Sequence, residues 1–290
     1  MAQKKKIWEA VIHGMFLILG LITVGCVLLI TVYLVISGIP AIRKIGLGAF
    51  LTGKVWESTA AQPHYGILPF ILTSVYGTAG AIVLGVPIGF LTAVYLSKVA
   101  PKGVKRALNS AVSLLAGIPS VVYGLVGMLV LVPAIRKTFH LPDGASLLAA
   151  ILVLAVMILP SIIKVSVTAL DAVPKEYEDA SLALGATPIE TYFRVSVPAA
   201  KSGIAAAVVL GVGRAIGEAM AVMMVSGNAP NMPSFFESVR FLTTAVASEM
   251  SYSSGLQRQA LFSIALVLYL FIMLINAALN FFLKRNKEGD

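Results

Sequence analysis

The stretch Gly144–Ile163, GASLLAAILVLAVMILPSII, decides the fold, because none of its residues carries a charge. A helix needs about 20 mostly apolar residues to cross the hydrocarbon core of a bilayer. The whole chain of 290 residues has the same character, with 58% hydrophobic and 12% charged residues and a mean hydropathy of +0.93. Because an ordinary soluble domain has about 25% charged residues, the composition predicts a polytopic membrane protein.

Five further regions on either side of this stretch have the length and apolar character of membrane spans. We predict an all-α fold with a transmembrane domain at 14–283, a cytoplasmic N-terminus at 1–13 and a cytoplasmic C-terminus at 284–290. The first region follows three lysines, as a signal peptide would, but its apolar run is too long for one. The six predicted spans are Gly14–Ile42, Ile67–Leu96, Ala107–Ile135, Gly144–Ile163, Gly203–Ser226 and Gln259–Leu283.

The orientation follows from lysine and arginine, which gather on the cytoplasmic side of membrane proteins. Thirteen of the 22 basic residues fall on the side of the two termini and seven on the other, so we place both termini in the cytoplasm. The net charge of +9 is therefore topological, and we expect membrane lipid and no nucleic acid as a partner. On the outer side, we expect Phe50 and Trp56 to lie at the membrane interface.

The inward loop 169–202 has the pattern of two helices joined by a tight turn. Good helix formers fill Lys175–Leu184, and Gly185 suits the left-handed residue that ends a helix. Thr187–Glu190, TPIE, supplies a capping box for a second helix, which we expect Pro198 to interrupt. The loop is predicted to be a helix–turn–helix elbow, and the pattern alone leaves open whether it is a docking site or a well-folded loop.

The fifth span contains the only charges deep in a predicted helix. Arg214 and Glu218 are four residues apart, which places both on one face of a continuous helix. Each charge costs about 3 kcal/mol at mid-bilayer, so a role in a substrate path is the first hypothesis and a structural ion pair the second. Gly213 and Gly217 form a G-x-x-x-G pair, which predicts close packing against another helix.

Other motifs carry no chemistry. The segment Gly48–Lys54 resembles a P-loop, but Val55 replaces the hydroxyl residue that would hold Mg²⁺. The three histidines fall in separate segments, so we expect no metal site, and Cys26 has no partner for a disulfide. No nucleophile and base occur at catalytic spacing. We therefore expect a chain that is not an enzyme and binds no cofactor.

The elbow carries a family resemblance. Asp179-Ala180-Ser181-x-x-x-Gly185, then nine residues, then Val195-x-Val197-Pro198 resembles the E-A-A-x-x-x-G…I-x-L-P signature of ABC-importer permeases. The resemblance implies that the elbow docks on a cytoplasmic ATPase. The residues it implies at this contact are Glu178, Asp179, Ala180, Ser181, Gly185 and Pro198.

Two further segments narrow the resemblance. Gly117–Gly124, GIPSVVYG, and Gly213–Asn228, GRAIGEAMAVMMVSGN, are similar to the C-type permease subunit of the Pst phosphate system, with Ala219 where a threonine is expected. The resemblance implies a type I permease fold in the plasma membrane of a prokaryote. It also implies Arg214 and Glu218 in the path of phosphate, which suits the planar fork of a guanidinium.

The same resemblance implies partners. They are an A-type permease that completes a heterodimer, two copies of an ATPase subunit that carries ATP and Mg²⁺, and an external phosphate-binding protein. Two alternatives stay open: a permease for another oxyanion or small solute, and a channel or carrier that needs no ATPase. The elbow argues against the second alternative, since a channel has no use for an ATPase dock.

Overall fold

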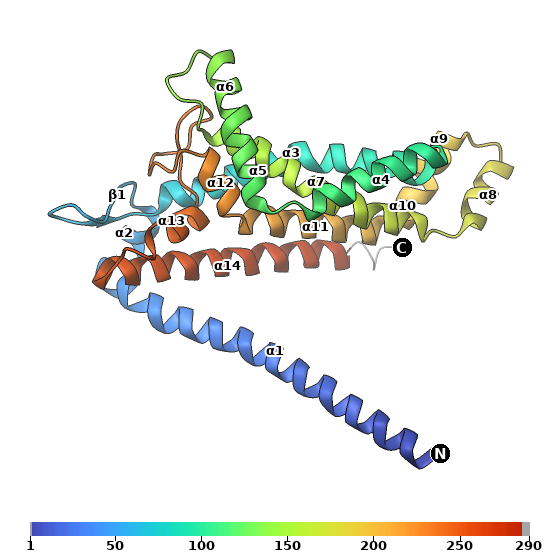
Figure 1. The fold of residues 1–290 in the computed structure, drawn as a ribbon, viewed down its shortest axis with the longest axis horizontal. Coiled ribbons are helices and arrows are strands. Elements are labelled where there is room, and N and C mark those ends of the chain that lie inside the picture. The colour runs from blue at the N-terminus through green and yellow to red at the C-terminus, as the bar shows by residue number, and fades with distance from the viewer. Residues whose placement is uncertain (1, 286–290) are drawn as a thin grey trace.

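The computed structural model describes residues 2–285 and is built almost entirely of helices (Figure 1). Three short segments, η1 to η3, are π-helical turns that continue the helices beside them. The elements are α1 (Ala2–Ile45), α2 (Leu47–Thr52), β1 (Trp56–Glu57), β2 (His64–Tyr65), α3 (Leu68–Val94), η1 (Tyr95–Val99), α4 (Lys102–Gly117), α5 (Ser120–Val126), η2 (Gly127–Leu131), α6 (Val132–Thr138), α7 (Leu147–Asp171), α8 (Lys175–Ala183), α9 (Pro188–Thr191), η3 (Tyr192–Ser196), α10 (Val197–Ala199), α11 (Lys201–Gly217), α12 (Met220–Val225), α13 (Leu242–Glu249) and α14 (Gly255–Arg285).

The predicted six-span architecture is confirmed, with one span broken. Five helical segments are long and apolar enough to cross a membrane by themselves. The sixth, Lys201–Gly217, passes this test only together with the preceding Pro188–Ala199 of the elbow, from which it is bent by 72°. The β1–β2 hairpin lies at one end of the molecule and the α8–α9 elbow at the other, so we call these the hairpin end and the elbow end (Figure 1).

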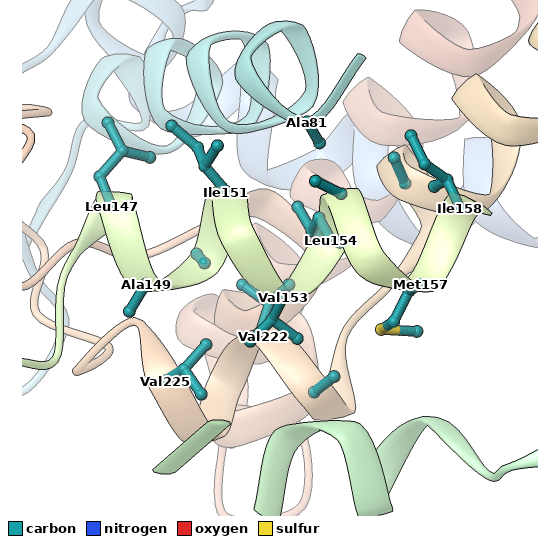
Figure 2. Close-up of a cluster of buried hydrophobic side chains, with 14 of the residues drawn as sticks. Ala81, Leu147, Ala149, Ile151, Val153, Leu154, Met157, Ile158, Val222 and Val225 are labelled. Atoms are coloured by element: carbon teal, nitrogen blue, oxygen red, sulfur yellow. The ribbon is translucent and has the colours of Figure 1, made fainter. Parts of the chain in front are cut away.

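Helix α7 is the centre of the fold. Its first turn is capped by Ser146, whose hydroxyl accepts a hydrogen bond from the Ala149 amide. Its apolar side chains are buried on two opposite sides, because α3 packs against one side and α12 against the other (Figure 2). An all-round apolar helix of this kind is stable only when other helices or lipid surround it. Residues that contact α7 are therefore held on a rigid support.

Close packing between α3 and α7 depends on a small residue. A Cβ atom at Gly85 would lie 2.7 Å from the Cδ1 atom of Ile158, so a larger residue there requires the Ile158 side chain or α7 to shift. Pro87 in α3 and Pro160 in α7 do not break their helices, although prolines are common helix breakers. Neighbouring helices support the backbone at these points, as they do in other membrane proteins.

The third predicted span, Ala107–Ile135, is wrong at its start. The chain leaves helical geometry at Ile118 and Pro119, and the apolar span covers Ser120–Thr138 instead. The preceding residues form α4, a separate amphipathic helix with polar residues along one side. Tyr123 bridges the break, because its hydroxyl donates a 2.7 Å hydrogen bond to the Leu115 carbonyl.

Phe50 and Trp56, which we expected at the membrane interface, are covered by other parts of the chain. Both are buried in a cluster formed by α2, the β1–β2 hairpin, α3, α13 and α14. The Trp56 indole NH donates to both carboxylate oxygens of Glu249, at 3.3 Å each, and Glu249 also pairs with Arg240. This polar network ties the hairpin to α13, so a large aromatic ring near a predicted loop serves as core here.

Helix α1 stands apart from the rest of the molecule over most of its length (Figure 1). It contacts α14 near the hairpin end, where the Ser263 hydroxyl donates a 2.6 Å bond to the Gly38 carbonyl. The start of α1 and the end of α14 both point toward the elbow end (Figure 1). The predicted C-terminal segment 284–290 lies mostly outside the described residues.

Candidate functional site

The fifth predicted span is broken at Glu218, which we predicted to lie on the same helix face as Arg214. Helix α11 ends at Gly217, and Glu218 has the extended backbone angles φ −74° and ψ 129°. Helix α12 starts only at Met220. The prediction that Arg214 and Glu218 share one face of a continuous helix is therefore wrong, and the two side chains form no ion pair. A run of apolar residues with two glycines carries no signal that distinguishes a broken span from a continuous one.

Arg214 lies in the last turn of α11. At a rise of about 1.5 Å per residue, it is about 20 Å from the start of this helix. Its side chain is half-buried, and Nη1 donates a 3.4 Å hydrogen bond to the Ser161 hydroxyl of α7. Its positive charge also acts on Tyr123, the residue that bridges the α4–α5 break. The guanidinium is thus held by α7, and this one long hydrogen bond to a neutral hydroxyl leaves most of its donors available.

Glu218 has a local structural contact that the sequence did not reveal. Its Oε1 atom accepts a 3.0 Å hydrogen bond from the Ala221 amide and so caps the short helix α12. Its main-chain carbonyl accepts a 2.8 Å bond from the Thr243 hydroxyl of α13. These two bonds fix the break in place. The capping bond uses one carboxylate oxygen, and the charge of the group has no ionic partner among the described residues.

The predicted packing face of Gly213 and Gly217 is open. A Cβ atom at either position would meet no atom within 4 Å in the described part of the chain. No helix between residues 2 and 285 therefore packs closely on these glycines. Contact with a helix of another subunit stays a prediction.

The elbow has the predicted geometry in detail. Gly185 has a φ of +87°, and the amides of Gly185 and Ala186 bond to the Leu182 and Ser181 carbonyls, which is the Schellman motif. Thr187 forms the predicted capping box with Glu190 at the start of α9. Glycine is required at this turn because a side chain with a Cβ is strained at positive φ.

The second half of the elbow differs from prediction in one respect. The chain turns sharply at Ala200, two residues after Pro198. Pro198 itself lies within helical backbone, in α10, which directly follows the π-helical turn η3. Since proline donates no amide hydrogen, a wider π turn before it accommodates the missing bond.

The signature residues of the elbow divide into two groups. Glu178 and Ser181 face the molecule: Glu178 is half-buried, and the Ser181 hydroxyl lies 2.9 Å from that of Thr191, which joins α8 to α9. The others are exposed, among them Asp179 and Ala180. At the tip, the apolar side chains of Leu184 and Ile189 are 90% and 68% exposed. Exposed apolar side chains on a well-ordered turn indicate a contact surface.

Glu178 is held by a lysine that sequence analysis used only for orientation. Lys98 Nζ lies 2.6 Å from Glu178 Oε1, which also accepts a 2.8 Å hydrogen bond from the Ser196 hydroxyl. Burial by itself raises the pKa of Glu178, but the bonds from Lys98 and Ser196 and the charges of Lys98 and Lys175 outweigh it, so the pKa is lowered. No spacing in the sequence relates positions 98 and 178.

Among the residues that the structure describes, no group of three or more His, Cys, Asp or Glu side chains is arranged to hold a metal ion. Residues 48–52 of the P-loop-like segment lie within the short helix α2. A P-loop instead places its glycine-rich loop before a helix.

Comparisons with known proteins agree on one family. The model of the binding-protein-dependent transport system inner membrane component matches residues 85–288. The chain is 40% identical to the probable ABC transporter permease protein YqgH of Bacillus subtilis, over 88% of this chain and 86% of that protein. It is 34% identical to the phosphate transport system permease protein PstC of Haemophilus influenzae, over 85% of this chain and 84% of that one.

Solved structures show the same fold at low sequence identity. The MetNI methionine ABC transporter in an inward-facing conformation aligns with a TM-score of 0.59 at 20% identity, over 76% of this chain and 96% of that one. A bacterial alginate ABC transporter aligns with a TM-score of 0.59 at 17% identity, over 95% of both chains. At these identities the likeness concerns the arrangement of helices and says nothing of the substrate.

Proposed function

The chain belongs to the family of binding-protein-dependent transport system inner membrane components, and we propose that it is the permease subunit of an ATP-driven phosphate importer. It forms one side of the translocation path and moves phosphate across the plasma membrane of a prokaryote. The observation that carries the proposal is Arg214, a guanidinium held on α11 in the interior of a broken span. The similarity to PstC supports phosphate as the substrate.

The chemistry of Arg214 fits an oxyanion. A guanidinium offers five N–H donors in a planar fork that matches two phosphate oxygens at once. Ser161 takes only one of these donors, through a long 3.4 Å bond that a charged ligand readily displaces. The carboxylate of Glu218 accepts a hydrogen bond from the proton of HPO₄²⁻, whereas sulfate has no such proton at neutral pH. This difference favours phosphate over sulfate.

The elbow is the contact with the ATPase in this proposal. Its exposed apolar tip, Leu184 and Ile189, inserts into a groove on the ATPase, and the Schellman turn at Gly185 fixes the direction of the tip. The elbow and both ends of the chain lie on the cytoplasmic side, in agreement with the excess of basic residues there. ATP and Mg²⁺ belong to the ATPase, and this chain binds neither.

The open face of Gly213 and Gly217 is where we place the second permease. An A-type permease subunit packs there and closes the path around Arg214, since charged residues in membrane spans face a protein interior or a water-filled cavity. Two ATPase copies and an external phosphate-binding protein complete the importer. A permease for another oxyanion is the alternative, because the same fork binds other oxyanions.

ATP hydrolysis by the purified complex tests this proposal. The permease pair, the ATPase and the binding protein are assembled in lipid nanodiscs, and hydrolysis is measured with the binding protein loaded with phosphate or kept free of it. We expect phosphate-loaded binding protein to stimulate hydrolysis and sulfate to have no effect. Equal hydrolysis with and without phosphate, in a complex of intact composition, would contradict the proposal.

A further inference from the structure

The elbow is attached to the rest of the chain at two bends. One bend is the segment 172–174 between α7 and α8, and the other is the turn at Ala200, where the helical segments meet at 72°. Between these bends the elbow is a firm unit, because Ser181 and Thr191 join its two helices and the Gly185 turn is fully hydrogen-bonded. A unit between two bends swings unless something else holds it.

An apolar cluster that includes Val173 and Ala200 packs the base of the elbow against α7 and η1, and Lys98 adds the charged contact. Lys98 lies in η1, which continues α3 without interruption, and its side chain is only 11% exposed. Its Nζ atom lies 2.6 Å from Glu178 of α8 and donates a 2.9 Å hydrogen bond to the carbonyl of Leu170 in the last turn of α7. A single ammonium group therefore joins α3, α7 and the elbow.

Removing the Lys98–Glu178 ion pair from water costs more free energy than a purely structural contact between apolar residues. Both partners are largely removed from water, and a buried ion pair is rarely more stabilising than two apolar residues of the same size. What an ion pair provides is a fixed distance and direction between elements. Here each partner also has a second hydrogen-bond partner, Ser196 for Glu178 and the Leu170 carbonyl for Lys98, so neighbours on both sides set the geometry.

We propose that Lys98 and Glu178 form a strut that transmits movement of the elbow to the inner ends of α3 and α7. This inference rests on the proposed function, in which an ATPase displaces the elbow. Helices α3 and α7 are tightly packed at Gly85 and Ile158, so they follow the strut as one body. The movement then reaches Ser161 of α7, the hydrogen-bond partner of Arg214 in the path. Lys98 is a positioning residue that touches neither phosphate nor ATP.

A second ion pair at the elbow end supplies the matched control. Lys105 of α4 lies 3.2 Å from Asp171 at the end of α7, but these side chains are 34% and 42% exposed and neither belongs to the elbow. Removing this pair removes the same kind of charge from the same end of the molecule. It leaves the link between the elbow and α3 intact.

The test compares the number of phosphate ions moved per ATP hydrolysed. The complete complex is reconstituted in liposomes as wild type, Lys98→Met, Lys98→Arg, Lys105→Met, and the double variant Lys98→Met with Glu178→Met. Wild-type uptake establishes the importer itself, and its absence would count against the proposed function rather than the strut. Assembly is checked by size-exclusion chromatography.

We expect Lys98→Met to keep phosphate-stimulated ATP hydrolysis and to move about tenfold less phosphate per ATP. Lys98→Arg should recover part of the ratio, because it keeps the charge, and Lys105→Met should match wild type. The double variant removes both charges, so it should assemble at least as well as Lys98→Met and still be uncoupled.

Three results would overturn the strut. The first is a wild-type ratio in assembled Lys98→Met or in the double variant. The second is an equal loss in Lys105→Met, which would make the effect one of general charge. The third is failure of the double variant to assemble, which would reduce the pair to a structural support.

Discussion

Arg214, whose guanidinium lies within an apolar span, is the residue on which the proposed transport of phosphate depends. Arg214 is held by Ser161 through one long hydrogen bond, and the rest of its fork is available to a ligand. A charge at this depth costs about 3 kcal/mol, which a folded chain tolerates where the charge faces a cavity or a ligand. Its hydrogen bond to Ser161 places the guanidinium of α11 beside α7.

Arg214→Lys tests the fork rather than the charge. Lysine keeps the positive charge but loses the planar pair of donors, so we expect phosphate uptake to fall about tenfold while the complex still assembles. The matched control is Arg136→Lys, the same change at an exposed position in the last turn of α6. Unchanged uptake in Arg214→Lys would show that a point charge suffices there.

Glu218 allows its two roles to be separated. Glutamine keeps the oxygen that caps α12 and removes the charge, whereas alanine removes both. We expect Glu218→Gln to assemble normally and to move less phosphate. Glu218→Ala should in addition lower the stability of the subunit by about 1 kcal/mol, the usual cost of a lost cap. Thermal unfolding in detergent separates the two variants, and identical behaviour of both would leave only the structural role.

Glu178 predicts a pH dependence of the elbow. Its pKa is lower in the folded chain than in the unfolded one, because Lys98 and Ser196 stabilise the carboxylate against the effect of burial. The stability that it contributes is therefore complete above the ordinary glutamate pKa and is lost as the pH falls through the lower, folded value. Amide hydrogen exchange of α8 should rise with acid in wild type more steeply than in Glu178→Gln. Parallel pH profiles would contradict the assignment.

At the scale of elements, the turn at Gly185 is the most sharply defined feature. Its φ of +87° is costly for any residue with a Cβ, so Gly185→Val should distort the tip that carries Leu184 and Ile189. We expect the membrane subunits to insert and the ATPase to dock weakly, with uptake lost. Gly103→Val is the control, since Gly103 is exposed and has open space around it. Normal docking by Gly185→Val would show that the turn is not the contact.

The elbow was predictable from sequence because its signals are local. Proline, glycine and a capping box each fix the backbone within a few residues, and the structure confirms them from Lys175 to Glu190. The breaks in the spans were not predictable in the same way. Gly117–Pro119 interrupts the helix, whereas Gly85–Pro87 lies in a continuous helix. The reason is that α7 packs against α3 and supports its backbone at Gly85–Pro87.

The sequence did not predict the polar contacts that join distant segments. Lys98 contacts Glu178, Ser161 contacts Arg214, and Trp56 contacts Glu249. Each contact depends on how whole helices pack. Composition and periodicity report which residues lie in a membrane. They carry no information on which polar residues of different spans come together.

At the scale of the whole molecule, the chain has surfaces that its own helices leave uncovered. Helix α1 leaves the body, and the glycine face beside Arg214 is uncovered within the described residues (Figure 1). A charged residue beside an uncovered apolar face is unstable in lipid, so a second permease subunit is expected to complete the path. In the proposed importer, ATP hydrolysis at the elbow end acts on Arg214 through the Lys98–Glu178 pair, α3 and α7.

The central claim is that this chain moves phosphate at the expense of ATP along a path that contains Arg214. The most direct measurement is uptake of radiolabelled phosphate into liposomes that hold the complete complex, with ATP on the elbow side and loaded binding protein on the other. We predict ATP-dependent uptake that sulfate does not inhibit, that Arg136→Lys leaves unchanged, and that Arg214→Lys lowers about tenfold. Full uptake by an assembled Arg214→Lys complex, or uptake that needs no ATP, would contradict the account.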